Sequence, residues 1–136
     1  MKRPDHAVQT VLSVPFHDCD PLGVVWHGRY FEYLEVARCE LFKTCRLDIP
    51  DVKALGLRMF VSEARCRYNA PLCYGDSVSV LAWFSERDPL IRISYDLFNE
   101  TKSRLAGRAS TRLALTNASG ELLSQMPATV RERLPA

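Results

Sequence analysis

The sequence predicts an α+β fold in which a five-stranded antiparallel sheet curls around one long central helix. Two observations predict it: one long stretch has apolar residues at helical spacing, and four later stretches alternate between apolar and polar residues. The chain has 136 residues, of which 47% are hydrophobic and 25% are charged. That size and balance suit a single folded domain, expected to span residues 1–136, and they exclude a disordered chain.

The N-terminal part of the chain predicts a strand followed by a loop. Residues 7–16 are mostly apolar, and Pro15 marks the irregular end of this strand. The next segment, residues 17–23, combines Asp, Pro and Gly in one short run, which is typical of a loop.

Residues 28–45 predict one long amphipathic helix. Apolar residues recur there at steps of three and four, at Tyr30, Leu34, Ala37, Leu41 and Cys45. A short second helix is expected over residues 50–55. Pro50 suits the first turn of a helix, and Gly56 suits the position just after a helix end.

Alternation with a period of two predicts four strands after Gly56, over residues 58–68, 77–84, 90–98 and 104–116. In the first of these, we expect Phe60, Ala64, Cys66 and Tyr68 to share one face. In the last, Arg104, Arg108 and Arg112 also fit helical spacing. The alternation along the whole stretch favours a strand with a solvated arginine face.

The assembly of these elements follows from their links and faces. Short links predict that consecutive strands pair as antiparallel neighbours. Because one helix cannot cover a five-stranded sheet, the sheet must wrap its apolar face around the helix. The sheet edges stay open unless a second copy pairs with one of them, which predicts a homodimer or homotetramer. The polar residues after Met126 predict a loosely held tail.

Composition excludes several classes of function. The net charge of +2 is too small to predict a nucleic-acid partner. The longest run without a charged residue, from His6 to His17, is too short to cross a membrane, and no secretory leader is expected. No pair of the five cysteines has C-x-x-C spacing and the three histidines are scattered. We therefore expect free thiols, no metal site and a cytoplasmic protein.

The segment directly before the long helix carries residues suited to catalysis. It holds two acids, Asp18 and Asp20, and two histidines, His17 and His27, followed by Gly28. The first amides of a helix have no partner within that helix and attract anionic oxygen. A carboxylate aimed at the same point would add a nucleophile or a base, which is the pairing that acyl transfer needs.

This segment resembles the signature of the hotdog-fold acyl-CoA thioesterases. The resemblance rests on Phe16-x-Asp18-Cys19-Asp20-Pro21-x-Gly23-Val24-Val25-Trp26-x-x-x-Tyr30 with Leu34-Glu35-x-Ala37-Arg38, and on Glu63-Ala64-x-Cys66-x-Tyr68-x-Ala70-Pro71 with Asp76. The most similar subgroup contains 4-hydroxybenzoyl-CoA thioesterase and the YbgC-type enzymes. The YbgC-type enzymes carry a histidine at the position of His27, whereas the 4-hydroxybenzoyl enzymes carry an aromatic residue there.

The resemblance implies hydrolysis of an acyl-CoA thioester without a metal or other cofactor. It implies that Asp20 is the catalytic nucleophile or general base, with His27 beside it and the amides near His27 and Gly28 as the oxyanion hole. It places the site at a dimer seam. The further substrate-binding residues we expect are Gly28, Tyr30, Glu35, Glu63, Arg65 and Arg87. Among these, Arg65 and Arg87, together with Arg67 and Arg92, are candidates to meet the CoA phosphates.

Simpler roles for these residues stay open. Asp20 could be a turn residue before Pro21, Asp18 a structural acceptor for loop amides, and Tyr30 a packing residue. The function also has alternatives. These are a thioesterase acting on acyl-carrier protein, a hydratase or dehydratase of enoyl thioesters, and a non-catalytic binder of acyl thioesters.

Overall fold

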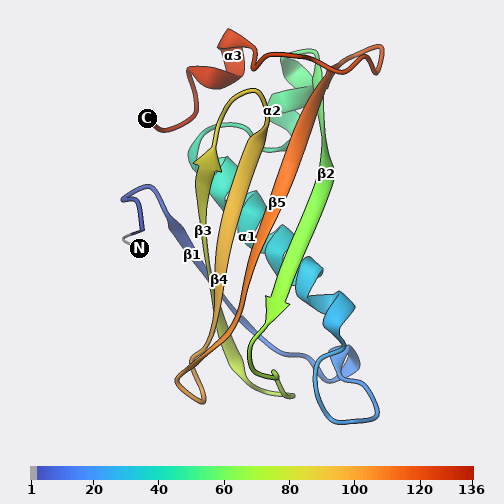
Figure 1. The fold of residues 1–136 in the computed structure, drawn as a ribbon, viewed down its shortest axis with the longest axis vertical. Coiled ribbons are helices and arrows are strands. Elements are labelled where there is room, and N and C mark those ends of the chain that lie inside the picture. The colour runs from blue at the N-terminus through green and yellow to red at the C-terminus, as the bar shows by residue number, and fades with distance from the viewer. Residues whose placement is uncertain (1–2) are drawn as a thin grey trace.

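The computed structural model describes residues 3–136 and shows a single sheet that wraps a long helix (Figure 1). Its elements are β1 (Val8–Ser13), α1 (Tyr30–Thr44), α2 (Ile49–Ala54), β2 (Leu57–Tyr68), β3 (Ser77–Glu86), β4 (Ile91–Asn99), β5 (Arg104–Asn117) and α3 (Ala128–Arg131). Single 3-10 turns span Phe16–Asp18 and His27–Arg29. None of the described helices is long and apolar enough to cross a membrane.

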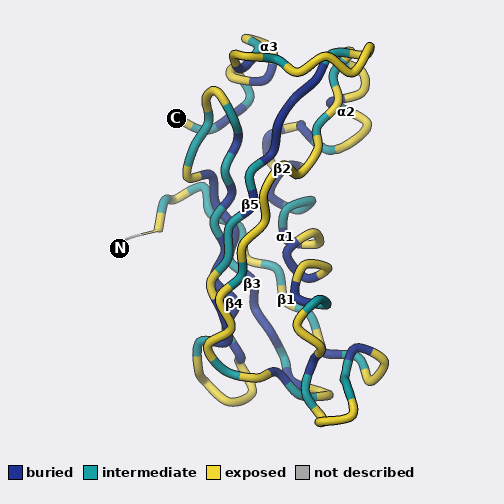
Figure 2. Tube along the Cα trace, turned by 45° about the vertical axis from the view of Figure 1, so that its right-hand side comes forward, coloured by how far each residue is buried: buried dark blue, intermediate teal, exposed yellow. Residues whose placement is uncertain are grey.

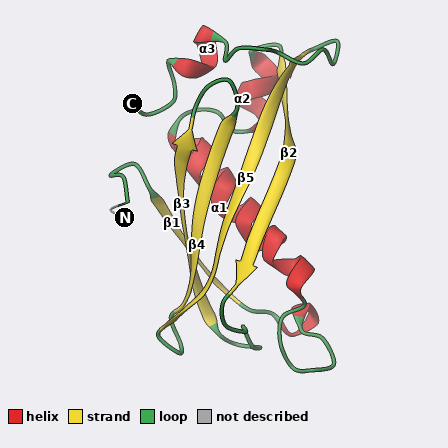
Figure 3. Cartoon of the chain, viewed as in Figure 1, coloured by secondary structure: helices red, strands yellow, loops and turns green. Residues whose placement is uncertain are grey.

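The five strands form one antiparallel sheet in the order β1-β3-β4-β5-β2, with α1 packed across one face (Figure 3). The predicted α+β hotdog architecture is therefore confirmed. The expectation that all consecutive strands pair is wrong for β2, which pairs with β5 rather than β3. The link from β2 to β3 is not a tight turn: it buries Leu72 in the core, and the Leu72 carbonyl accepts from the Val25 amide at 2.8 Å.

The core lies between α1 and the concave face of the sheet. Leu34, Ala37 and Leu41 on α1 are completely buried, as are Val80 on β3 and Ile93 on β4. Figure 2 shows buried segments along β3, β4 and β5. The helical and two-residue periods of the sequence therefore correspond to the two surfaces that pack together.

A β-bulge in β2 overturns the predicted face of Phe60. The pairing with β5 shifts between Val61 and Glu63, so Ser62 is an extra residue. Before the bulge, Met59 packs against the core and Phe60 is 48% exposed. After it, the face opposite Arg65 carries Cys66, which packs against the core. The bulge reverses the parity, which strict alternation along the sequence could not predict.

The C-terminal tail is packed, contrary to the expectation that it is loosely held. Met126, Val130 and Leu134 are buried around α3. The Met126 amide donates to Asp88 Oδ1 at 3.0 Å, and the Arg87 Nε donates to the Pro135 carbonyl at 2.6 Å. These three apolar side chains lie among polar neighbours in the sequence, and they cover this end of the core.

Candidate active site

The loop between β1 and α1 is a short hairpin that brings residue 18 beside residue 26. Cys19 and Val25 form a bridge, the Asp20 amide donates to the Val24 carbonyl at 2.8 Å, and the Trp26 amide donates to the Asp18 carbonyl at 3.0 Å. Asp20 therefore lies at the turn of a hairpin whose far strand leads directly into His27 and Gly28. Backbone hydrogen bonds hold the candidate acid and the helix start on one rigid loop.

The Asp20 side chain has one bound oxygen and one open oxygen. Oδ1 accepts from the Leu22 amide at 2.9 Å and lies 3.4 Å from the Val24 amide. Oδ2 accepts no hydrogen bond from residues 3–136, and Asp20 has no ion-pair partner among them. One oxygen of Asp20 therefore stabilises the turn, and the other remains available for a ligand.

The start of α1 is left without caps. Among the described residues, no side chain caps the His27–Arg29 turn or the first turn of α1. The Arg29 amide donates to Trp26 and the Tyr30 amide to His27, whereas the amides of His27 and Gly28 find no acceptor within residues 3–136. Two unpaired N–H groups at a helix start are suited to bind a negatively charged oxygen.

Aromatic rings hold the helix start in place. The Trp26 ring lies so close to Gly28 that a Cβ added there would overlap it. The His27 ring lies 5.0 Å from the Trp26 ring and 6.1 Å from the Tyr68 ring, between centroids. The Tyr68 hydroxyl of β2 also donates to the His27 carbonyl at 3.0 Å. Only a glycine at position 28 lets the indole cover the backbone in this way.

Asp18 and Tyr30 hold the loop to the core. The expectation that Asp18 serves loop amides is wrong: its buried Oδ2 accepts from the Tyr33 hydroxyl at 2.6 Å. Its Oδ1 makes no hydrogen bond within residues 3–136 but lies 3.3 Å from His17 Nε2 and 3.6 Å from Arg29 Nε. Tyr30 is 3% exposed, and burial raises the pKa of Tyr30 to about 12, so it packs as a neutral side chain.

Glu35 borders an apolar groove of about 740 Å³ between α1, α2 and β2. Its carboxylate is 70% exposed and lies 4.0 Å from Arg38, so the two do not form a buried pair. The groove is lined mainly by apolar residues, which include Phe42, Leu47, Leu57, Met59 and Leu113. Such a concave apolar surface suits the non-polar part of a ligand.

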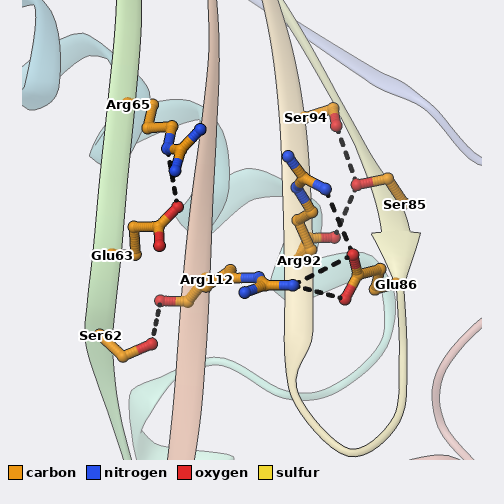
Figure 4. A network of polar contacts seen from close by, with 8 residues as sticks. All are labelled: Ser62, Glu63, Arg65, Ser85, Glu86, Arg92, Ser94 and Arg112. Carbon is orange, nitrogen blue, oxygen red and sulfur yellow. Dashed lines mark hydrogen bonds and ion pairs between the residues drawn. The ribbon is translucent and has the colours of Figure 1, made fainter.

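The other predicted residues do not join the loop. Glu63 and Arg65 form an ion pair at 2.9 Å on the convex face of the sheet, opposite α1 (Figure 4). Arg87 lies at the β3–β4 turn near α3, at the opposite end of the sheet from the residue 19–29 loop (Figure 1). Its guanidinium is bound to the Pro135 carbonyl.

Three residues of this region were not singled out as functional by the sequence: Trp26, Tyr33 and Tyr68. Trp26 and Tyr68 stand within the quoted motifs, so the resemblance contained a signal for them. Tyr33 lies one residue from the helical stripe, and only its contact with Asp18 shows its role.

The fold and this site together define a class: a hotdog protein in which an acid on a rigid loop precedes uncapped helix amides. Comparison with known proteins agrees. The model of the thioesterase-like superfamily matches residues 14–134, and the chain belongs to that family. It is therefore a thioesterase of the hotdog fold.

Three relatives illustrate the likeness. A proposed esterase of Aquifex aeolicus is 30% identical over 122 residues, covering 89% of this chain and 92% of that protein. A proposed acyl-CoA thioesterase of Bacillus subtilis, YneP, is 24% identical over 131 residues, which cover 96% of this chain and 91% of YneP. The crystal structure of the DHNA-CoA thioesterase from Staphylococcus aureus matches with a TM-score of 0.80 and 25% sequence identity. The match covers 87% of this chain and 80% of that enzyme.

Proposed function

We propose that the protein hydrolyses an acyl-CoA thioester to the free acid and coenzyme A, with Asp20 as the catalytic carboxylate. The observation that carries the proposal is the pair of unpaired amides at His27 and Gly28, which follow the hairpin that holds Asp20. The names of YneP and of the Staphylococcus aureus enzyme refer to CoA thioesters, which supports this substrate class.

The chemistry requires charge stabilisation and one carboxylate. Attack on the thioester carbonyl places negative charge on its oxygen, which the two amides would stabilise. Two routes are open to Asp20. Its free oxygen can attack the carbonyl carbon, so that the C–S bond breaks and the CoA thiolate leaves. Asp20 is then held as a mixed anhydride with the acyl group, and water cleaves this anhydride. It can instead remove a proton from a water molecule that attacks directly.

The remaining residues have supporting roles in this proposal. The ring of His27, exposed beside Trp26, lies at the mouth of the site as the second candidate catalytic group. Gly28 and Tyr30 shape the helix start, and the groove beside Glu35 receives the acyl group. Glu63, Arg65 and Arg87 are left out of the proposed catalytic site because their partners lie elsewhere.

The open edge of β2 supports the proposed oligomer. β2 pairs with β5 on one side only, and Phe60, Val61 and Tyr68 on this strand are exposed apolar residues. An open edge of this length favours pairing with another chain. We infer a cytoplasmic homodimer or homotetramer in which the partner closes the site near Tyr68.

The test is thiol release from a panel of acyl-CoA substrates by the wild-type protein and by Asp20→Asn. Asparagine keeps an oxygen for the Leu22 amide, so the turn is retained while the negative charge is lost. We expect kcat to fall by about 100-fold or more, the usual contribution of a general base. Asp5→Asn, an exposed residue, is the matched control. Full turnover by Asp20→Asn would remove Asp20 from the mechanism.

The same panel separates the alternatives. If thiol release is faster from carrier-protein thioesters than from acyl-CoA, the protein is a thioesterase that acts on acyl-carrier protein. Loss of enoyl absorbance without thiol release would indicate a hydratase. Binding in calorimetry without any turnover would indicate a non-catalytic binder.

A further inference from the structure

The convex face of the sheet carries a groove of about 570 Å³ that the proposed thioesterase site does not use. Its lining includes five arginines, Arg3, Arg65, Arg67, Arg92 and Arg108, and one acid, Asp96. The formal charge of this lining is +4, whereas the whole chain carries only +2. Positive charge is therefore concentrated on one face of the molecule.

The strand register builds the groove from rows of long and short side chains. The central row pairs Arg65 with Ser110, Ser110 with Ser94, and Ser94 with Trp83. Residues directly opposite in a sheet point to the same side, so the two serines form a low floor.

Longer side chains flank this floor in the adjacent rows. On one side Arg67 pairs with Arg108 and Arg108 with Asp96. On the other side Arg112 pairs with Arg92, next to Glu86 (Figure 4). The floor of hydroxyls is thus bounded by guanidinium groups on both sides.

The acids nearby neutralise only part of this charge. Asp96 contacts both Arg3 and Arg108, and Glu86 contacts Arg92 at 3.2 Å and Arg112 at 3.4 Å. Glu63 pairs with Arg65 at 2.9 Å. Arg67 has no ion-pair partner within residues 3–136, and the Ser110 hydroxyl makes no hydrogen bond there. Donors without acceptors therefore remain at the centre and along one wall.

The charge decides what the groove can hold. The same face of a second copy would set arginine against arginine, and an apolar partner would strip water from charges without replacing it. Pairing along the edge of β2 would leave this face open. Phosphate oxygens match guanidinium and hydroxyl donors in number and charge.

We propose that this convex groove is a binding site for a phosphate-bearing small molecule, with Arg67, Arg108 and Ser110 as contacts. Its two possible sources are the phosphates of coenzyme A and a free nucleotide. The site is separate from the Asp20 loop; the coenzyme A source rests on the proposed function, whereas the free-nucleotide source does not.

The test is calorimetric titration of the full chain with inorganic pyrophosphate at low salt. We expect saturable binding that weakens about tenfold in Arg67→Gln, the loss of one charge-assisted contact. Ser110→Leu fills the floor and should abolish binding without changing charge. Arg104→Gln is the matched control, since it lies on the same strand outside the groove lining.

Coenzyme A and ATP, titrated in parallel, distinguish the sources. If Arg67→Gln weakens the binding of coenzyme A as well as pyrophosphate, the ligand is the nucleotide end of the coenzyme. If only pyrophosphate and ATP are affected, the ligand is a free nucleotide. Absence of saturable pyrophosphate binding, or an equal loss in Arg104→Gln, would overturn the proposal.

Discussion

The Tyr33 hydroxyl donates a 2.6 Å hydrogen bond to Asp18 Oδ2, and this contact joins the loop that carries Asp20 to the core helix. Both side chains are buried. Burial, together with this hydrogen bond, raises the pKa of Tyr33 well above its usual value, so Tyr33 remains a donor at every physiological pH. The loop that presents Asp20 is thereby fixed to the helix whose amides it faces in the proposed mechanism.

Tyr33→Phe should lower the free energy of unfolding by about 1.5–3 kcal/mol, because it leaves a buried carboxylate without its hydroxyl donor. Urea denaturation checks this value. Tyr74→Phe, which changes a 65% exposed tyrosine, is the control and should stay within about 0.5 kcal/mol of wild type. Equal stability of Tyr33→Phe and wild type would contradict the anchoring role.

Gly28→Ala should displace the Trp26 ring, since the added methyl group overlaps it. We expect a cost of about 1–3 kcal/mol in stability and a fall in kcat, because the open amides move with the ring. A double-mutant cycle with Trp26→Ala tests the cause. If Gly28→Ala costs as much in the Trp26→Ala background as in wild type, the clash is not the reason.

Asp76 should make stability depend on acid pH. Burial alone would raise the pKa of Asp76, but hydrogen bonds from the Cys73 amide and Asn99, with Lys102 nearby, hold it below the ordinary 3.8. A lowered pKa in the folded state means that the unfolded state binds the proton more tightly. Stability is therefore full above about pH 3.8 and falls as the pH drops further.

The measurement is the urea midpoint between pH 6 and pH 2.5, repeated for Asp76→Asn. This variant should be about 1.5–3 kcal/mol less stable at neutral pH, where the carboxylate hydrogen bonds are missing, and should show a flatter acid limb. An unchanged acid limb would show that other carboxyl groups are responsible for the acid dependence.

His6 should also make the stability of the fold depend on pH, in a range nearer to neutral pH. Its Nε2 accepts the Phe84 amide at 2.9 Å, which requires the neutral ring. Burial and then the charge of Arg87 lower the pKa of His6 below 6.5. The stability from this contact is therefore full above about pH 6.5 and decreases as the pH falls through the folded pKa. Thermal melts at pH 7.5 and 5.5 should show a smaller difference in melting temperature for His6→Gln than for the wild type, because the variant lacks the imidazole that accepts from the Phe84 amide.

Periodicity determined most of the secondary structure and the identity of the core. The steps of three and four through Leu34 and Leu41 place one face of α1 against the sheet, and the alternation through β3 and β4 supplies the facing surface. Both patterns are local consequences of backbone geometry, so they can be derived from neighbours in the sequence. The curled sheet around one helix was predictable for the same reason, whereas the hotdog family and the interest of the segment that carries Asp20, His27 and Gly28 came from the resemblance of that segment to a known motif.

Only the tertiary structure decided relationships between distant residues. The position of β2 beside β5 depends on a link that enters the core at Leu72, and the exposure of Phe60 depends on one extra residue in a strand. The partners of Asp18, Arg87 and Met126 depend on where separate elements meet. A hydrogen bond or buried contact across the fold has no periodic signature in the sequence, because its energy depends on both partners being brought together.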